Sequence, residues 1–213
     1  MIIKVCGMRH IDNIRRVAAL KVDWLGFIFH PESQRYVNAE AGEALREEIQ
    51  DAPFGKVGVF VHASAEEMID TAIRYGLDYL QLHGNESPEV CRTLQQQGFS
   101  LIKAFSVAGA EDLERTASYR GLADYFLFDT KCENHGGSGR SFDWSLLSAY
   151  QGETPFLLSG GIRPDSLDAI RRFRHPRLAG FDLNSGFEIL PGKKDVEKLA
   201  PFVRTLQTEH LSL

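Results

Sequence analysis

Short apolar runs alternate with amphipathic helical segments along the whole sequence, and this alternation restricts the fold more than any other feature. Several of the runs are continuously apolar, which is typical of strands that are covered by helices on both faces of a sheet. The runs are rich in the β-branched and aromatic residues that strands favour. There are eight of them, at residues 2–6, 24–29, 56–61, 79–82, 101–107, 125–129, 155–159 and 178–183.

A helical segment follows each strand-like run. We expect Ser64 to cap one of these helices, because its hydroxyl can accept a hydrogen bond from a free amide of the first turn. Eight strand–helix units predict a closed (β/α)8 TIM barrel of eight parallel strands. An open doubly wound sheet is the main alternative, but its phosphate-binding loop usually follows the first strand, whereas the glycine-rich loops come late here. The helices are expected to begin near Ile11, Ala39, Ala65, Ser87, Ala110, Asp143, Asp165 and Asp195.

The composition fits one globular domain. The chain has 213 residues, 43% of them hydrophobic and 25% charged, so we expect a single catalytic domain over residues 1–213. The 24 Lys and Arg residues are scattered and are outnumbered by 29 Asp and Glu residues, which argues against nucleic acid as a partner. No signal-peptide pattern and no apolar run of membrane-spanning length occur, so we expect a cytoplasmic protein that is not a membrane partner.

The three cysteines do not form a recognisable group. Cys6, Cys91 and Cys132 are odd in number, far apart and without CxxC spacing. This pattern argues against both a disulfide framework and a structural zinc site. Each cysteine therefore has to be interpreted separately, and the default for Cys91 and Cys132 is a structural role.

Polar residues gather at the carboxyl ends of the predicted strands, which is the end where barrel enzymes carry their reactive groups. Nothing comparable is seen at the opposite ends. The residues at the carboxyl ends include Lys4, Cys6, His62, Gln81, His83, Lys103, Ser106, Asp129, Ser159, Asp182 and Asn184.

Three glycine-rich segments lie in the last third of the chain, at 135–144, 158–166 and 182–188. Glycine lets the backbone approach an anion closely, so that exposed amides can donate to it. The usual phosphate site of such barrels lies among the loops after strands seven and eight. We therefore expect a phosphate to be bound by Gly137, Gly139, Ser159, Gly160, Gly161, Asn184, Ser185 and Gly186.

At this level of detail the sequence resembles the phosphoribosylanthranilate isomerases of tryptophan biosynthesis. The resemblance covers nearly the whole chain, and the order and spacing of the motifs fit that family. The motifs are KVCGM at 4–8, GFIFHPESQRYV at 26–37, VGVFV at 57–61, LQLHGNE at 80–86, IKAF at 102–105, LFDT at 127–130, GGSGRSFDW at 136–144, LSGGI at 158–162 and DLNSGFE at 182–188.

The resemblance implies a cofactor-independent Amadori rearrangement of N-(5-phosphoribosyl)anthranilate. It assigns the acid to Asp129, which has to hold a proton when the substrate binds, and the base to Cys6. A thiol with an ordinary pKa of ~8.5 is only slightly ionised at neutral pH, so Cys6 would benefit from a nearby positive charge such as Lys4. The resemblance also assigns the anthranilate carboxylate to Arg35, whose planar fork suits it. We further expect His83 and Asp182 to bind the substrate.

Two other functions compete with this interpretation. His30, His62 and His83 follow three consecutive strands and could hold the metal of a sugar-phosphate epimerase, although acidic partners beside them are not evident. We expect no metal ligands, since histidines more often serve as plain hydrogen-bonding groups. A catalytically silent barrel is the third hypothesis, and the presence of both Cys6 and Asp129 argues against it.

The sequence departs from the usual family pattern at several positions. Residue 62 is His where Asn is expected, residue 34 is Gln where Pro is frequent, and Phe187 is bulkier than its usual counterpart. These changes lead us to consider an altered substrate preference. For the oligomeric state the sequence leaves monomer and homodimer open.

Overall fold

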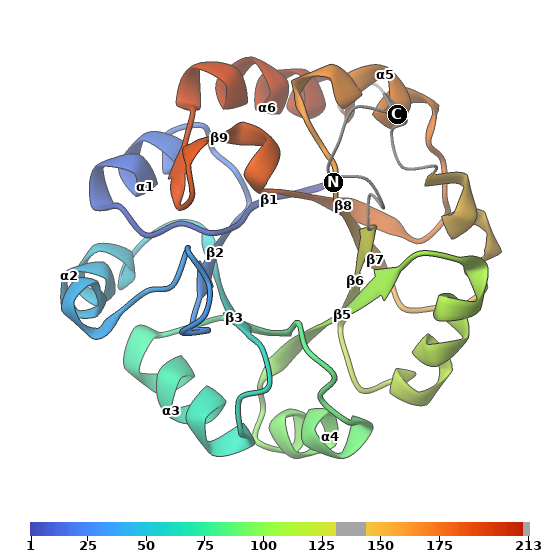
Figure 1. Ribbon diagram of the computed structural model, residues 1–213, viewed down its shortest axis with the longest axis horizontal. Coiled ribbons are helices and arrows are strands. Elements are labelled where there is room, and N and C mark those ends of the chain that lie inside the picture. The colour runs from blue at the N-terminus through green and yellow to red at the C-terminus, as the bar shows by residue number, and fades with distance from the viewer. Residues whose placement is uncertain (131–143, 211–213) are drawn as a thin grey trace.

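The chain forms a closed barrel of eight parallel strands with helices around it, as Figure 1 shows. The structure is a computed structural model that describes residues 1–130 and 144–210. Neighbouring strands pair in sequence order, and β8 closes the ring by pairing with β1. The predicted fold class is therefore confirmed. The strands are β1 (Ile2–Val5), β2 (Trp24–Ile28), β3 (Gly55–Phe60), β4 (Tyr79–Leu82), β5 (Ser100–Val107), β6 (Tyr125–Thr130), β7 (Phe156–Ser159) and β8 (Leu178–Leu183).

Helices connect successive strands on the outside of the barrel. The described helices between β5 and β6 and between β6 and β7 are 3₁₀ helices instead of α-helices. The described helices are α1 (Ile11–Ala18), α2 (Ala39–Ile49), α3 (Ala65–Tyr75), α4 (Pro88–Gln96), η1 (Ala110–Tyr119), η2 (Trp144–Ala149), η3 (Pro164–Ser166), α5 (Leu167–Arg172), η4 (Ser185–Phe187) and α6 (Val196–His210). No helix in residues 1–130 and 144–210 is long and apolar enough to cross a membrane.

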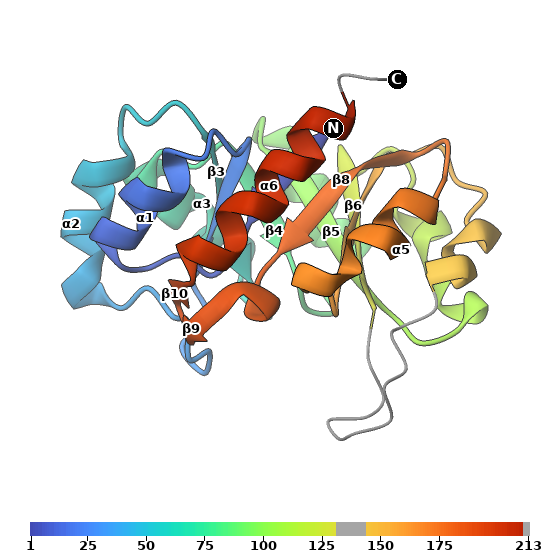
Figure 2. The same ribbon diagram turned by 90° about the horizontal axis from the view of Figure 1, so that it is seen from above.

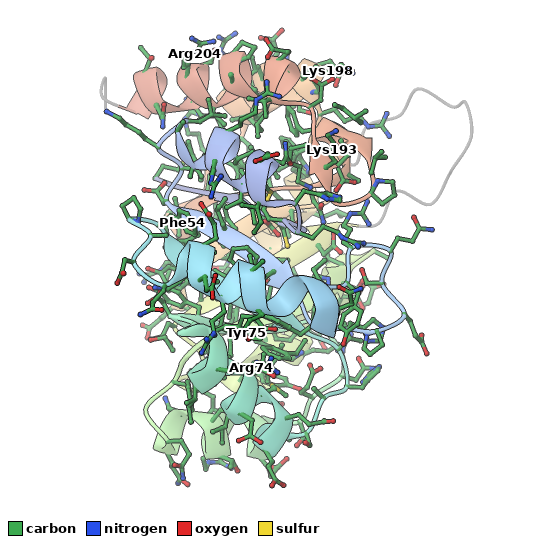
Figure 3. The ribbon with its side chains drawn as sticks, turned by 90° about the vertical axis from the view of Figure 1, so that its left-hand side faces the viewer. Phe54, Arg74, Tyr75, Lys193, Lys198 and Arg204 are labelled. Carbon is green, nitrogen blue, oxygen red and sulfur yellow. The ribbon has the colours of Figure 1, made fainter. Side chains whose placement is uncertain are left out.

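Ser64 caps α3 as predicted. Its hydroxyl accepts a hydrogen bond from the backbone N–H of Glu67, and the Glu67 carboxylate accepts one from the backbone N–H of Ser64. Further along the same helix, Tyr75 packs closely against Gly42 of α2, where a Cβ would collide with the Tyr75 hydroxyl. Figure 3 shows Tyr75 between the two helices, with Arg74 beside it. The glycine thus permits the close approach of α2 and α3.

Successive side chains along each strand point alternately toward the helices and into the barrel, which divides the apolar side chains into two sets. The larger apolar set packs between the barrel and the helices. The smaller set fills the barrel interior, where Trp24 contacts both Tyr79 and Tyr125. Because Tyr79 and Tyr125 begin their strands, these aromatic rings close the amino end of the barrel and leave the carboxyl end for a site.

A small hairpin follows β8 and was not anticipated from the sequence. Its strands are β9 (Glu188–Leu190) and β10 (Lys193–Lys194), which pair antiparallel. Figure 2 shows this hairpin at the end of the molecule opposite the chain's N-terminus, which is the end where the parallel strands finish. The hairpin therefore borders the face where a barrel carries its active site.

Candidate active site

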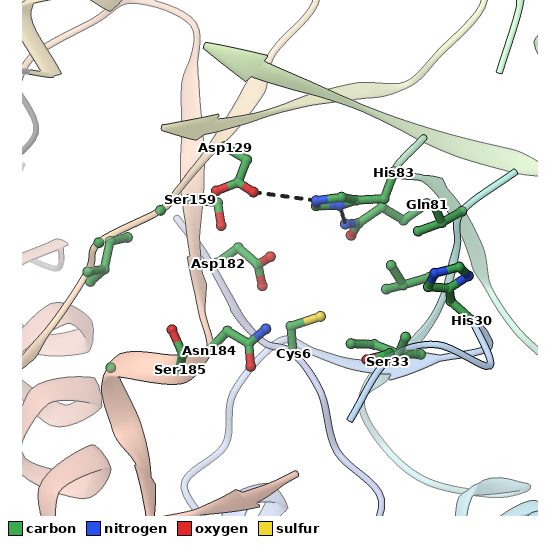
Figure 4. A pocket seen from close by; sticks show the side chains of 17 residues that line it. Cys6, His30, Ser33, Gln81, His83, Asp129, Ser159, Asp182, Asn184 and Ser185 are labelled. Carbon is green, nitrogen blue, oxygen red and sulfur yellow. Dashed lines mark hydrogen bonds and ion pairs between the residues drawn. The ribbon is translucent and has the colours of Figure 1, made fainter. Parts of the chain in front are cut away.

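A pocket opens at the carboxyl ends of the strands and collects most of the predicted site residues. Figure 4 shows the side chains of Cys6, Asp129 and Asp182 directed into this common space. The thiol and the carboxyl group thus meet in one pocket, although they come from the first and the sixth strands. The pocket is lined by Cys6, Ile28, His30, Ser33, Val59, Val61, Gln81, His83, Asp129, Ser159, Gly160, Gly161, Ile162, Asp182, Asn184, Ser185 and Gly186.

Lys4 and Asp182 form a buried ion pair beneath the thiol of Cys6. Lys4 lies level with Asp182 in the β1–β8 register, and its Nζ donates to Asp182 Oδ1 at 2.9 Å. Burial opposes the charge of Lys4, but Asp182 and Cys6 together keep the pKa of Lys4 above its ordinary value. A Cβ on Gly26 would lie 2.8 Å from the Cys6 sulfur and 3.2 Å from Lys4 Nζ. Gly26 therefore leaves room for both groups on the same side of the barrel.

Burial dominates the protonation of Cys6. It raises the pKa of the thiol, while the positive charges of Lys4 and Lys194 act in the opposite direction and Asp182 reinforces the rise. Lys4 thus supplies the positive charge that the sequence suggested, but burial outweighs it. A pKa above the ordinary value makes the thiolate the minor form of Cys6 at neutral pH, with the ammonium of Lys4 beside it.

Asp129 faces His83 across the pocket. His83 Nε2 lies 3.5 Å from Asp129 Oδ2, and about a third of each side chain is exposed. On the other side of the imidazole, Gln81 Nε2 lies 2.7 Å from His83 Nδ1. Gln81 and His83 share a face because they are two residues apart on and just after β4.

The loops after β7 and β8 form the part of the pocket expected to bind phosphate. Gly160 and Gly161 have φ values of +84° and +66°, a backbone conformation that side chains with a Cβ rarely adopt. A Cβ on Gly186 would collide with the Ile162 carbonyl, so the two loops touch. Gly137 and Gly139, which were also assigned to phosphate, lie outside the described residues.

Arg35 is held at the edge of the pocket by an acidic partner. Its Nε and Nη2 donate to the Glu188 carboxylate at 2.9 and 2.6 Å. Lys194 Nζ lies 2.7 Å from the same carboxylate and 2.7 Å from Asn184 Oδ1. Although burial opposes ionisation, Arg35 and Lys194 together hold the pKa of Glu188 below its ordinary value. Arg35 does not line the pocket itself, and its role at a substrate carboxylate stays a prediction.

The three histidines considered as metal ligands do not share one location. His30 and His83 line the pocket, but His62 does not. His62 has a positive φ of 56°, and its backbone N–H donates to Glu86. In the part of the chain that the structure describes, no three His, Cys, Asp or Glu side chains form a group that could hold a metal ion.

The departures at residues 34 and 187 do not line the pocket. Phe187 is fully buried and packs against Phe202 of α6, with ring centroids 4.8 Å apart. The backbone carbonyl of Gln34 accepts a hydrogen bond from Arg9. The extra bulk of Phe187 therefore does not enter the pocket, because its ring fills the space between η4 and α6.

Sequence reasoning gave no role to several residues of the site. Gln81 and Lys103 were noted only as polar strand-end residues, although the position of Gln81 two residues before His83 was a signal that they share a face. Glu86 and Lys103 form a second buried ion pair, with 3.1 Å between Lys103 Nζ and Glu86 Oε2. No local sequence pattern marked Glu188 and Lys194 as neighbours of the site, since the hairpin after β8 brings them beside Arg35.

A closed parallel barrel with a pocket at the carboxyl ends of its strands, lined by a thiol and carboxyl groups, is the architecture of a (β/α)8-barrel enzyme. A sequence model of the N-(5'phosphoribosyl)anthranilate (PRA) isomerase family matches residues 3–205. The chain belongs to this family.

Individual relatives agree with the family match. The chain is 60% identical to the N-(5'-phosphoribosyl)anthranilate isomerase of Parabacteroides distasonis over 97% of this chain and 93% of that protein. Among solved structures, a phosphoribosylanthranilate isomerase in complex with reduced 1-(o-carboxyphenylamino)-1-deoxyribulose 5-phosphate is similar with a TM-score of 0.81 and 31% identity, covering 96% of this chain and 97% of that one. Monomers generated from the dimeric isomerase of Thermotoga maritima give a TM-score of 0.83 and 31% identity, over 98% and 100% of the two chains.

Proposed function

We propose that this pocket converts N-(5'-phosphoribosyl)anthranilate to 1-(2-carboxyphenylamino)-1-deoxyribulose 5-phosphate, a step of tryptophan biosynthesis. The observation that carries the proposal is the meeting of Cys6 and Asp129 in one pocket at the carboxyl end of the barrel. The membership of the chain in the isomerase family supports it, as does the solved relative with the reduced product analogue.

Asp129 is the general acid of this proposal. It donates its proton to the oxygen of the ribose ring as the C1–O bond breaks, and the anthranilate nitrogen lone pair forms a C1=N bond. Ring opening needs a proton at this oxygen because an alkoxide is a poor leaving group at neutral pH. The exposure of Asp129 to the pocket supports the assignment.

Cys6 is the general base. Its thiolate removes the proton from C2, the C–H electrons form C1=C2, and the electrons of the C=N bond return to nitrogen. The resulting enol becomes the ketone when C1 gains a proton and the hydroxyl on C2 loses one, so that the C2–O bond becomes a carbonyl. C2 is oxidised and C1 is reduced within one molecule, so the reaction is an aldose–ketose isomerisation that needs no cofactor. Lys4 stabilises the thiolate as it forms, because its ammonium is fixed nearby by Asp182.

The remaining pocket residues bind the two ends of the substrate. We assign the phosphate to the glycine-lined loops, with Ser159, Asn184 and Ser185 as side-chain partners, and the anthranilate carboxylate to Arg35. His83 and Asp182 lie between these ends and bind the sugar. The positive φ values of Gly160 and Gly161 support a loop in which backbone amides donate to an anion.

We also propose that residues 1–213 form a single catalytic domain. The protein acts in the cytoplasm on a small phosphorylated sugar, without nucleic acid or membrane as a partner. It works as a monomer or a homodimer. The homodimer is one of the two states because the relative from Thermotoga maritima is described as dimeric.

One assay tests the proposed function directly. Freshly made phosphoribosylanthranilate is mixed with the purified protein, and anthranilate-type fluorescence is followed as the substrate is consumed. We expect rapid loss of substrate and accumulation of the deoxyribulose phosphate, which mass spectrometry with borohydride trapping identifies as the ketone. If the substrate decays only at its spontaneous rate, the proposal is wrong.

A further inference from the structure

The amide of Gln81 determines which nitrogen of His83 carries a proton. Gln81 is fully buried, and its Nε2 lies 2.7 Å from His83 Nδ1. An amide nitrogen is only a donor, so Nδ1 has to be the acceptor of this hydrogen bond. In a neutral imidazole the proton is then on Nε2.

The proton on Nε2 is directed at Asp129. Nε2 lies 3.5 Å from Asp129 Oδ2, so the imidazole is a donor toward the carboxyl group and has no lone pair with which to accept its proton. His83 can take that proton only by becoming an imidazolium with a second N–H on Nδ1. That N–H would point at the N–H of the Gln81 amide, so two donors would face each other with no acceptor between them.

We propose that Gln81 is a positioning residue for catalysis: by keeping the proton of His83 on Nε2, it prevents His83 from accepting the proton of Asp129, which is thereby kept for the substrate. This inference rests on the proposed role of Asp129 as the acid. After the proton has passed to the ring oxygen, the same Nε2–H donates to the Asp129 carboxylate and stabilises its charge.

The opposite orientation of the Gln81 amide would place the proton of His83 on the other ring nitrogen. If Gln81 Oε1 faced His83, Nδ1 would carry the proton and Nε2 would accept the proton of Asp129. As described, Oε1 of Gln81 is buried and has no hydrogen-bond partner among residues 1–130 and 144–210. The reversed amide would leave its two N–H donors in that position instead, where no acceptor among the described residues meets them, which costs at least as much.

The tautomer of His83 is measured by NMR in the wild-type protein. Long-range ¹H–¹⁵N spectra of the seven histidines distinguish the two neutral tautomers and the imidazolium, and His83→Asn identifies the signals of this ring. At neutral pH we expect the neutral ring with its proton on Nε2. A proton on Nδ1, or an imidazolium, would overturn the proposal. This measurement needs no substrate, so it stands even if the assay of the proposed function fails.

Gln81→Glu tests the consequence for catalysis. A carboxylate facing Nδ1 requires an N–H there, so His83 becomes an imidazolium at neutral pH and Asp129 loses its proton. We expect kcat to fall about 10- to 100-fold with KM within about threefold, because acid catalysis acts in the transition state. Gln96→Glu, the same charge change at an exposed position of α4, should leave both constants unchanged. A loss confined to KM, or no loss, contradicts the proposal.

Gln81→Met keeps the test valid if the buried carboxylate prevents folding. Methionine has a similar volume and lacks the donor, so both tautomers become accessible and kcat should fall several-fold. In an Asp129→Asn background the same substitution should have no further effect, since no acid proton remains to be positioned. Equal losses in the two backgrounds would show that Gln81 acts independently of Asp129 and would overturn the proposal.

Discussion

Lys4 Nζ lies 2.9 Å from Asp182 Oδ1, and both side chains are almost entirely buried, with 0% and 4% of their surface exposed. The pair joins the first strand to the last at the point where the barrel closes, and it lies beside the thiol of Cys6. It therefore connects the closure of the fold with the ionisation of the proposed base.

Lys4→Met should make Cys6 less reactive. Burial already raises the pKa of the thiol, and Lys4 is the main group that opposes this rise. Without it the thiolate is less populated at every pH, so the pH profile of alkylation shifts to more alkaline values. Iodoacetamide labelling of the Cys6 peptide, quantified by mass spectrometry from neutral to alkaline pH, measures this. An unchanged profile in a folded Lys4→Met protein would show that Lys4 does not act on the thiol.

Cys6→Ala and Asp129→Asn should each lower turnover by about two to four orders of magnitude, the range for removal of a positioned acid or base. Both variants should still bind the product, because neither removes the residues assigned to its phosphate or carboxylate. Steady-state kinetics and product binding measured by fluorescence check the two parts. Turnover at the wild-type rate in either variant would refute the corresponding role.

Arg35→Ala should act mainly on substrate binding. A bond to the anthranilate carboxylate is present in the ground state and the transition state alike, so its loss raises KM and leaves kcat nearly unchanged. A substrate analogue without the carboxylate provides the control, because it should not distinguish the variant from the wild type. A large fall in kcat at unchanged KM would instead place Arg35 in the chemical step.

Glu188→Ala should destabilise the fold. The substitution leaves Lys194 buried without its carboxylate partner, and breaking a buried pair in this way costs about 3–5 kcal/mol. Arg16→Gln, which removes an exposed pair with Glu197, should change the free energy of unfolding by no more than about 0.5 kcal/mol. Urea denaturation of both variants makes the comparison, and equal stabilities would contradict the prediction.

Glu188 should also make the free energy of unfolding depend on pH in the acidic range. Its pKa is lower in the folded protein than its ordinary value, so its contribution is complete above the unfolded pKa of ~4.3 and is lost as the pH falls through the folded value. Urea midpoints between neutral pH and about pH 3 should therefore fall less steeply in Glu188→Gln than in the wild type. Parallel curves would show that Glu188 is not one of the responsible groups.

Much of the fold could be predicted because its signals are local. The apolar runs predicted all eight barrel strands to within one residue at each end, for example 101–107 against Ser100–Val107. The number of strands then implied closure. The 3₁₀ form of η1 and η2 and the β9–β10 hairpin were not predicted, because tertiary packing decides them and neither has a strong local pattern.

The sequence by itself determined the alternation of strands and helices, and hence that Cys6 and Asp129 end strands of one barrel. It also determined that Gln81 and His83 share a face, since every second side chain along a strand lies on the same side. Only the tertiary structure decided which charges face each other: Lys4 with Asp182 across the closure, and Arg35 with Glu188 across loops far apart in the chain. Those pairings depend on the register between strands and on the path of the loops, and neither is encoded in any short stretch of residues.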